Sequence, residues 1–367
     1  MDLKTEKYLK YLYLPGIFTS KRTRQILSVN PTDNQERVDA EKTIISAFKY
    51  NAEQLEEKKE ASINEVLNLS NKESITWINV DGIKKSEVEE LCSNYKIHPL
   101  ISEDIVSIGQ RPKTDEVEGV LYCLLNMLYY NEEHKTVETE QISVVLGENF
   151  VISFQDDTTR DVFNPLRNKL RNSKSQVRVR TADYLLYSIL DLIVDHYFTV
   201  MEKLGDEIEN LEADVVRKSN KRSLARINQL RKELIVLKRN IVPVRDLIGN
   251  IMRSECELLD DRTTKYFKDI YDHIFQAYDL SENYRDVIMS VQDLYLNNVN
   301  LKMNETMKIM AVLTTLLAPA TVIGGIFGMN FDIIPFSHHK EGFYIAIAAM
   351  FLTPILMLSW FRRKGML

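Results

Sequence analysis

Charged residues are absent from two stretches near the C-terminal end of the chain. Residues 309–331 are 23 consecutive positions without Asp, Glu, Lys or Arg, and residues 342–361 are 20 more. A helix of about 20 apolar residues crosses a hydrocarbon core about 30 Å thick. The pattern therefore predicts two membrane spans, joined by an external loop at 332–341 and followed by a short tail at 362–367.

The basic residues around these spans predict their orientation. Arg362, Arg363 and Lys364 follow the second span, and Lys302 and Lys308 precede the first. Positive residues favour the cytoplasmic side of a membrane. We therefore expect a multi-pass protein of the inner (plasma) membrane, with both chain termini in the cytoplasm.

The first part of the chain alternates between strand and helix signals, which predicts a cytosolic α/β domain over residues 1–165. Residues 142–146 and 150–154 flank Gly147-Glu148-Asn149 and predict a β-hairpin. The remaining strand signals lie at 75–80 and 119–130, and a helix signal lies at 86–95.

Residues 166–308 are predicted to form a helical domain that ends in a long stalk helix. Leu, Ile, Lys, Arg and Glu dominate from 182 to 239, with a break expected near Ser219-Asn220. Pro243 and Gly249 predict a second break. From residue 250 to 318 the chain lacks Gly and Pro, so one helix of about 100 Å would enter the first span directly.

The composition of the whole chain hides a difference between its apolar C-terminal end and the first 308 residues. Over 367 residues the mean hydropathy is −0.23, as in a soluble protein. Of 47 basic and 53 acidic residues, four basic and two acidic lie beyond residue 308, so the first 308 residues carry a formal charge of −8. An acidic soluble part argues against nucleic acid and suits a partner that is a cation. Three widely separated cysteines predict unpaired thiols in a reducing compartment.

A stripe of polar and small residues follows one face of the stalk and first span, at steps of three and four. Close helix packing through small residues is one explanation, and the wall of an aqueous pore is the other. The polar residues at its cytosolic end favour the pore, which needs several copies of the chain around an axis. The stripe consists of Asp293, Asn297, Asn300, Asn304, Met307, Ala311, Thr314, Ala318, Thr321, Gly325 and Gly328.

The tripeptide Gly328-Met329-Asn330 ends the first span, and a second span and a basic tail complete the chain. This arrangement resembles the CorA family of magnesium channels. Further segments over roughly residues 70–367 look like the same family, namely 96–100, 103–105, 110–113, 182–187, 271–273 and 284–286.

The resemblance implies a homopentamer with a cytosolic α/β funnel, a stalk helix continuing as the pore-lining span, and the second span as an outer ring. It implies passive Mg2+ influx driven by the membrane potential, with Co2+ and Ni2+ as further ions. Mg2+ would then be both the transported ion and a regulatory ligand. The two spans would contact membrane lipid, and no organic cofactor is expected. The chain also lacks a Gly-rich phosphate-binding loop, so an enzyme is not expected.

The resemblance assigns a role to each part of the stripe. Gly328, Met329 and Asn330 would form the selectivity filter, where a ring of amide oxygens accepts hydrogen bonds from a hydrated ion. Mg2+ gives up its water shell reluctantly, so this chemistry suits it. Met307 and Met310 would form a hydrophobic gate that closes by dewetting.

Regulation follows from the same resemblance. Asp104 and Asp269 match two acidic positions that meet between neighbouring subunits and hold an inhibitory Mg2+ ion. Glu103 and Asp191 are further candidates for a second ion. Without cation the carboxylates repel one another, and with cation they are bridged and the stalks are locked.

The chain departs from the family pattern at two places. Phe327 replaces the signature Tyr, and the external loop carries His338-His339 in place of an acidic segment. Imidazoles suit softer ions such as Zn2+, Co2+ or Ni2+. A zinc transporter of the ZntB type is therefore an alternative, and a membrane-anchored signalling or scaffold protein is an alternative from another class.

Overall fold

The computed structural model describes residues 37–67, 69, 73–329 and 341–365. The chain divides into two compact units, Met1–Gln292 and Asp293–Leu367. The first unit contains a sheet and most of the helices, and the second contains the end of one long helix and the final helix. Each unit is described separately below.

The sheet has seven strands in the order β2-β1-β3-β7-β6-β5-β4. Strands β3 and β7 run parallel, and the other neighbouring strands described run antiparallel. The strands are β1 (Ile44–Tyr50), β2 (Leu55–Lys58), β3 (Ile75–Asp81), β4 (Lys113–Val117), β5 (Val120–Asn131), β6 (Thr136–Leu146) and β7 (Phe150–Gln155).

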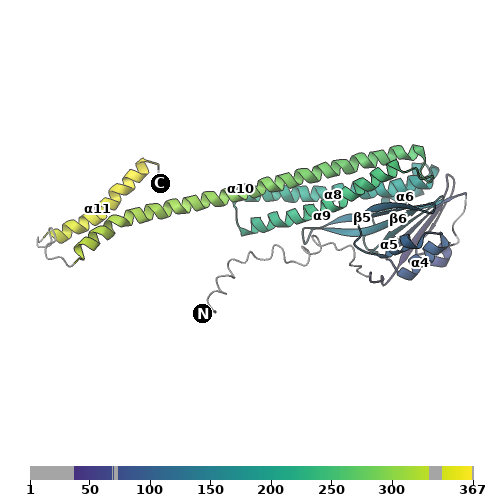
Figure 1. The fold of residues 1–367 in the computed structure, drawn as a ribbon, viewed down its shortest axis with the longest axis horizontal. Helices are drawn as coiled ribbons and strands as arrows, with labels where there is room; N and C mark the ends of the chain where they lie inside the picture. Colours follow the sequence, from purple (N-terminus) through teal and green to yellow (C-terminus); the bar gives the residue numbers. More distant parts are fainter. Residues whose placement is uncertain (1–36, 68, 70–72, 330–340, 366–367) are drawn as a thin grey trace. The chain divides into compact units, whose positions relative to one another are not determined.

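Helices of the first unit lie on both faces of this sheet (Figure 1). The short ones are α3 (Ile63–Leu67), α4 (Lys85–Asn94), α5 (Pro99–Val106), α6 (Asn164–Arg171) and α7 (Gln176–Val179). The long ones are α8 (Ala182–Arg217), α9 (Lys221–Arg253), α10 (Asp261–Phe327) and α11 (Gly342–Arg363).

Alternation along the central strands explains why both faces are covered. In β3, Ile78 and Val80 pack with Leu91 of α4 and Ile105 of α5 in one buried cluster. Side chains one position along a strand point to the opposite face. On this opposite face Trp77 is fully buried, and α8 contacts β5, β6 and β7. A sheet buried on both faces needs near-continuous apolar strands, and this is what β5 provides.

Several sequence predictions are confirmed. Strands β3 and β5 lie where expected, and β6 and β7 form the hairpin, closed by a 2.9 Å bond from Gly147 N to Phe150 O. The break between α8 and α9 falls at Asn220, whose side chain accepts from the backbone N–H of Arg222 and Ser223. Strands β2 and β4 form the sheet's edges, and their charged, partly exposed residues give no clear apolar alternation.

The predicted break at Pro243 and Gly249 is wrong, because α9 runs through both residues. A proline costs a helix interior about 3 kcal/mol, which burial of the surrounding residues offsets. Pro243 is itself buried beside Val244. At Gly249, an added Cβ would lie 3.4 Å from the ring of Tyr271 on α10, an ordinary contact distance, so this residue lies where α9 packs against α10.

The second break lies instead at residues 254–260, and the predicted single helix from residue 250 begins only at Asp261. Asp260 caps α10, since its side chain accepts from Arg262 N at 2.8 Å. Its own N–H donates to Asp183 Oδ2 at 2.9 Å, and Asp183 is 1% exposed at the start of α8. A tertiary hydrogen bond thus joins the first turns of the two helices.

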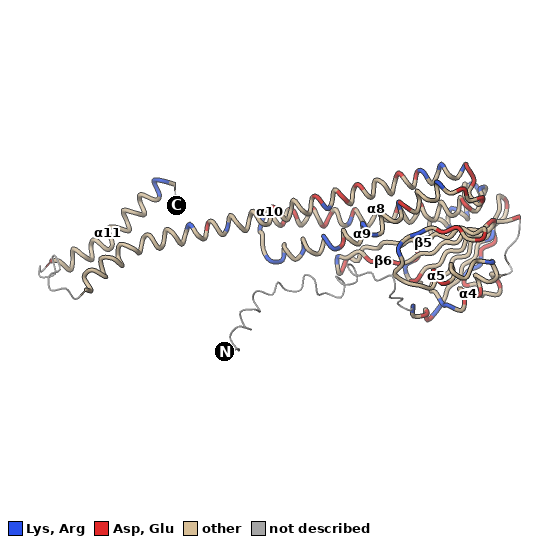
Figure 2. Tube along the Cα trace, viewed as in Figure 1, with Lys and Arg blue, Asp and Glu red and all other residues tan. Residues whose placement is uncertain are grey.

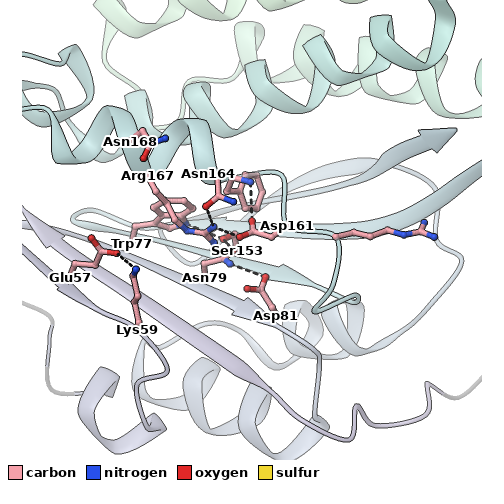
Figure 3. A network of polar contacts seen from close by, with 12 residues as sticks. Glu57, Lys59, Trp77, Asn79, Asp81, Ser153, Asp161, Asn164, Arg167 and Asn168 are labelled. Carbon is pink, nitrogen blue, oxygen red and sulfur yellow. Dashed lines mark hydrogen bonds and ion pairs between the residues drawn. The ribbon is translucent and has the colours of Figure 1, made fainter. Parts of the chain in front are cut away.

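A buried polar network links β3 and β7 (Figure 3). Trp77 Nε1 donates to Ser153 Oγ at 3.0 Å, Ser153 donates to Asn79 Oδ1 at 2.6 Å, and Asn79 Nδ2 donates to Asp81 Oδ1 at 2.8 Å. Burial raises the pKa of Asp81 to about 6, and the hydrogen bond from Asn79 only partly opposes this.

Candidate pore helix and metal-binding residues

Three helices in the described part of the chain are long and apolar enough to cross a membrane. The apolar window of α8 is 61% buried inside its own unit, so α8 is a core helix of the soluble part. The windows of α10 and α11 are 0% and 6% buried. Figure 2 shows that both lack charge until the basic end of α11. Among the described residues, their apolar surfaces therefore have almost no cover.

The predicted pore stripe is exposed along its whole described length. Each position is solvent-accessible in the single chain, and the methionines Met307 and Met310 are 54% and 60% exposed. The exposed stripe positions are Asp293, Asn297, Asn300, Asn304, Thr314, Ala318, Thr321, Gly325, Gly328 and Met329.

The less exposed residues of the first span lie on the opposite helix face. Val312 and Leu316 are partly buried and stand two positions on either side of Thr314, about 200° around the helix. A Cβ added to Gly324 would lie 3.5 Å from Met350 of α11, whereas one added to Gly325 meets no atom within 4 Å. The stripe is therefore turned away from α11 and is free to face other copies of the chain.

The threonines of the stripe present oxygen lone pairs. Thr314 Oγ1 donates to Met310 O at 2.8 Å, and Thr321 Oγ1 donates to Leu317 O at 3.1 Å. Because each hydroxyl hydrogen is bound to the backbone, the oxygen can act only as an acceptor toward its exposed side. An acceptor of this kind suits the water hydrogens of a hydrated cation.

Gly328 and Met329, the first two residues of the signature tripeptide, directly follow the end of α10. Gly328 N donates to Gly324 O at 3.0 Å, and Met329 N donates to Ile326 O at 3.3 Å. A Cβ on Gly328 would lie 3.1 Å from Gly324 O, so a larger residue would crowd this turn. The predicted filter residue Asn330 and the loop residues 331–340 lie outside the described residues.

Asp104, on α5, already has a cation partner within its own chain. Lys113 Nζ lies 2.5 Å from Asp104 Oδ2, and Gln110 Nε2 donates to Oδ1 at 2.9 Å. Lys113 also lies 3.3 Å from Asp115. Burial lowers the pKa of Lys113, but the hydrogen bonds and charges of Asp104 and Asp115 together outweigh it, so the pKa is raised. Glu103, one residue earlier, is exposed at a groove beside α4.

The other predicted regulatory residues lie between α8 and α10. Asp191 of α8 stands beside Asp195 and His273, and the ligand atoms of all three lie within 4.8 Å of one another. Burial, followed by repulsion from Asp195, raises the pKa of Asp191, and the charge of Asp269 adds to this. Asp269 itself is exposed on α10.

Sequence reasoning missed Lys113, Asp195 and His273. Each had a signal, since Lys113 and His273 lie in segments that resemble the family, and Asp195 follows Asp191 by one helical turn. Their pairing is tertiary, because α5 meets β4 and α8 meets α10 only in the folded chain.

The three cysteines are unpaired, as predicted, and the structure places all three in buried positions. Burial raises the pKa of Cys92 to about 11 and that of Cys123 to about 12. Because a thiol reacts and binds metal as the thiolate, these side chains are inert core residues.

Comparison with known proteins supplies the context for this geometry. The family model described as "CorA-like Mg2+ transporter protein" matches residues 72–363. The chain is 36% identical to the cobalt/magnesium transport protein CorA of Thermotoga maritima over 321 residues, covering 87% of this chain and 91% of that protein. It is 32% identical to the putative metal ion transporter YfjQ of Bacillus subtilis, covering 79% and 89%.

A solved structure is similar over nearly the whole chain. The complete CorA magnesium transporter from Methanocaldococcus jannaschii superposes with a TM-score of 0.75 at 25% identity. The match covers 88% of this chain and 99% of that one, so the α/β unit, the long helix and the C-terminal apolar helices occur together in both.

Proposed function

This chain belongs to the CorA-like Mg2+ transporter family, and from that membership and the geometry of α10 we propose that it conducts Mg2+ passively into the cytoplasm. The family is one of transporters rather than enzymes. Co2+ and Ni2+ are proposed as further ions, in keeping with the cobalt/magnesium name of the Thermotoga protein.

One observation supports this proposal above the others, namely the exposed polar stripe on the α10 face turned away from α11. The described residues of one chain leave that face exposed, so we propose that several copies close around it, with five as the resemblance implies. The scaffold alternative leaves the stripe without a role. An anchor helix needs an apolar surface only, whereas this surface carries Asn and Thr at regular steps.

The surroundings of α10 and α11 are proposed to be lipid. Uncovered apolar surface of this extent is stable in a bilayer, and Arg362, Arg363 and Lys364 would lie on the cytoplasmic side. Both termini would then be cytoplasmic, in the inner (plasma) membrane. The membrane potential favours entry of a divalent cation by about 4.6 kcal/mol per 100 mV, so influx needs no further energy source.

The proposed path takes the ion with its water shell. The Asn330 amides would select the hydrated ion at the outer mouth, within a filter of Gly328, Met329 and Asn330. Thr314 and Thr321 would accept hydrogen bonds from its waters, and Met307 and Met310 would close the cytosolic end by dewetting. Asp293 and the asparagines below the gate would hold the ion near the exit.

The proposed feedback uses Asp104 and Asp269 of neighbouring subunits, with Glu103 and Asp191 at a second ion. Binding of Mg2+ at Asp104 requires displacement of the Lys113 ammonium, since that group lies 2.5 Å from the carboxylate. The channel therefore has a cation of its own that competes with Mg2+ for the regulatory position.

Uptake into liposomes tests the function directly. Purified protein is reconstituted with an internal Mg2+ indicator, a potential negative inside, and a range of internal Mg2+ concentrations. We expect saturable Mg2+ entry that falls as internal Mg2+ rises and is lost in Asn330→Ala. Zinc entry that depends on a pH gradient, without Mg2+ entry, would assign the ZntB-type function, and absence of any flux would assign the scaffold function.

A further inference from the structure

A groove of about 990 Å³ lies beside α4 and α5, and its lining includes Arg37, from the segment before β1, and Lys85, at the start of α4. Ala40 N donates to Ile83 O at 3.1 Å, which holds the segment before β1 against the loop that follows β3. Asp156, which bonds to Arg37, directly follows β7. Strands β3 and β7 are parallel, so both end at the same edge of the sheet. Ligands of α/β sheets bind in crevices outside such carboxyl ends.

The guanidinium of Arg37 is buried and only partly paired. Its side chain is 5% exposed, and its Nη1 donates to Asp156 Oδ1. Nε and Nη2 are shielded from solvent and have no hydrogen-bond partner in the part of the chain that the structure describes. Burial lowers the pKa of Arg37, although the charge and hydrogen bond of Asp156 act to raise it. A buried cation with unpartnered donors is costly unless a ligand pairs with it.

A second arginine of this chain shows which group fits the same edge of a guanidinium. Nε and Nη2 of Arg171 donate to the two carboxylate oxygens of Glu57 at 2.9 Å and 2.7 Å. Two parallel hydrogen bonds of this kind match the planar fork of arginine to a carboxylate. The Arg171 side chain is 40% exposed, whereas Arg37 is buried and has the greater need of a partner. The partner expected at Arg37 is therefore a carboxylate.

The remaining lining of the groove sets the size and charge of the ligand. Ile97, Pro99 and Val106 supply apolar surface. Glu89 and Glu103 are exposed carboxylates of the same lining, and they would repel a second negative charge. A groove of this volume fits a small organic molecule rather than a bare ion.

We propose that this groove binds a small monocarboxylate with an apolar body, held by the Nε–Nη2 edge of Arg37. The carboxylate would accept both hydrogen bonds, and the body would lie against Ile97 and Val106. The side chains of Lys85 and Glu89 are 65% and 58% exposed, so they can move aside as the ligand enters. The site uses no metal and no second chain, and it does not depend on the proposed transport function.

Binding of isovalerate to metal-free, full-length protein in detergent tests the site. Dissociation constants are measured by ligand-observed NMR, with the uncharged amide isovaleramide as the matched ligand. We expect saturable binding of isovalerate to the wild type and at least about tenfold weaker binding of isovaleramide. Arg37→Gln should weaken isovalerate binding by a similar factor. Arg171→Gln removes an arginine whose edge Glu57 already fills, and should bind as the wild type does.

Asp156→Asn separates ligand binding from damage to the fold. This change removes the carboxylate that shares the guanidinium, so the charge of Arg37 is less compensated and isovalerate should bind about threefold more tightly. A purely structural role for the pair predicts instead that Arg37→Gln and Asp156→Asn both weaken binding, and that result would overturn the proposal.

Two further results would also overturn the proposal. One is equal binding of isovalerate and isovaleramide to the wild type, a comparison that stays valid if Arg37→Gln fails to fold. The other is tighter binding of inorganic phosphate than of isovalerate, which would assign the groove to a different anion.

Discussion

The ammonium of Lys113 lies 2.5 Å from Oδ2 of Asp104, the carboxylate proposed to bind regulatory Mg2+. Gln110 occupies the other oxygen at 2.9 Å. The carboxylate is thus satisfied before any ion arrives, and Mg2+ must compete with a cation already in place. In the proposed feedback, this competition would set the internal Mg2+ concentration at which the channel closes.

Removal of the Lys113 ammonium should make the channel more sensitive to inhibition by internal Mg2+. The side chains of Lys113 and Asp104 are 37% and 24% exposed, so we take the pair as worth at most about 1 kcal/mol. Lys113→Gln should therefore lower the half-inhibitory internal Mg2+ concentration about three- to fivefold in liposome flux assays. The matched control is Lys203→Gln, which removes an exposed lysine that pairs with Glu132 at 2.9 Å. An unchanged or higher half-inhibitory concentration in Lys113→Gln would contradict the competition.

Loss of Asp269, the second carboxylate of the proposed intersubunit site, should make the channel less sensitive to internal Mg2+. Asp269→Asn removes one negative charge from the proposed intersubunit site, so Mg2+ should bind there at least about tenfold more weakly. Flux should then persist at internal Mg2+ concentrations that close the wild type. Asp272→Asn changes an exposed carboxylate three residues further along α10 and should leave feedback intact. Equal feedback in the two variants would remove Asp269 from the mechanism.

Two adjacent threonines test which face of α10 meets the ion. Thr314 and Thr315 are both exposed, and each donates to the backbone carbonyl four residues earlier at 2.8 Å. Only Thr314 lies on the stripe, because one residue turns the helix by about 100°. Thr314→Val should reduce Mg2+ flux at least about fivefold, the factor that corresponds to loss of one acceptor worth about 1 kcal/mol, whereas Thr315→Val should conduct normally. A larger loss in Thr315→Val would place the pore on another face.

The buried carboxyl of Asp81 predicts a pH dependence of stability. Its pKa in the folded chain is about 6, above the ordinary 3.8, so the folded state binds a proton that the unfolded state has released between these values. The free energy of unfolding should therefore fall as pH rises from about 4 to 6, by up to about 3 kcal/mol from this group.

Asp81→Asn should remove that contribution. The variant should be more stable than the wild type above pH 6 and equal to it near pH 4, as measured by thermal unfolding of the full chain at several pH values. The asparagine keeps the oxygen that accepts from Asn79 Nδ2. Asp279→Asn, at an exposed position of α10, should leave the pH dependence unchanged. A difference between Asp81→Asn and the wild type that does not vary with pH would reject the titration.

The sequence alone determined the features that depend on neighbours along the chain. The charge-free stretches, the hairpin around Gly147, the helix break near Asn220 and the stripe on α10 follow from local periodicity, turn chemistry and residue spacing. A pattern of this kind is present in the chain before it folds, so it can be read directly.

The tertiary structure decided the features that depend on residues far apart in sequence. Helix α9 continues through Pro243 because burial outweighs proline's local cost, and α10 begins at Asp261 because Asp260 caps it and bonds to Asp183. Lys113 meets Asp104 across α5 and β4, and His273 meets Asp195 across two helices. Such contacts form only when packing brings the elements together, since no local propensity specifies them.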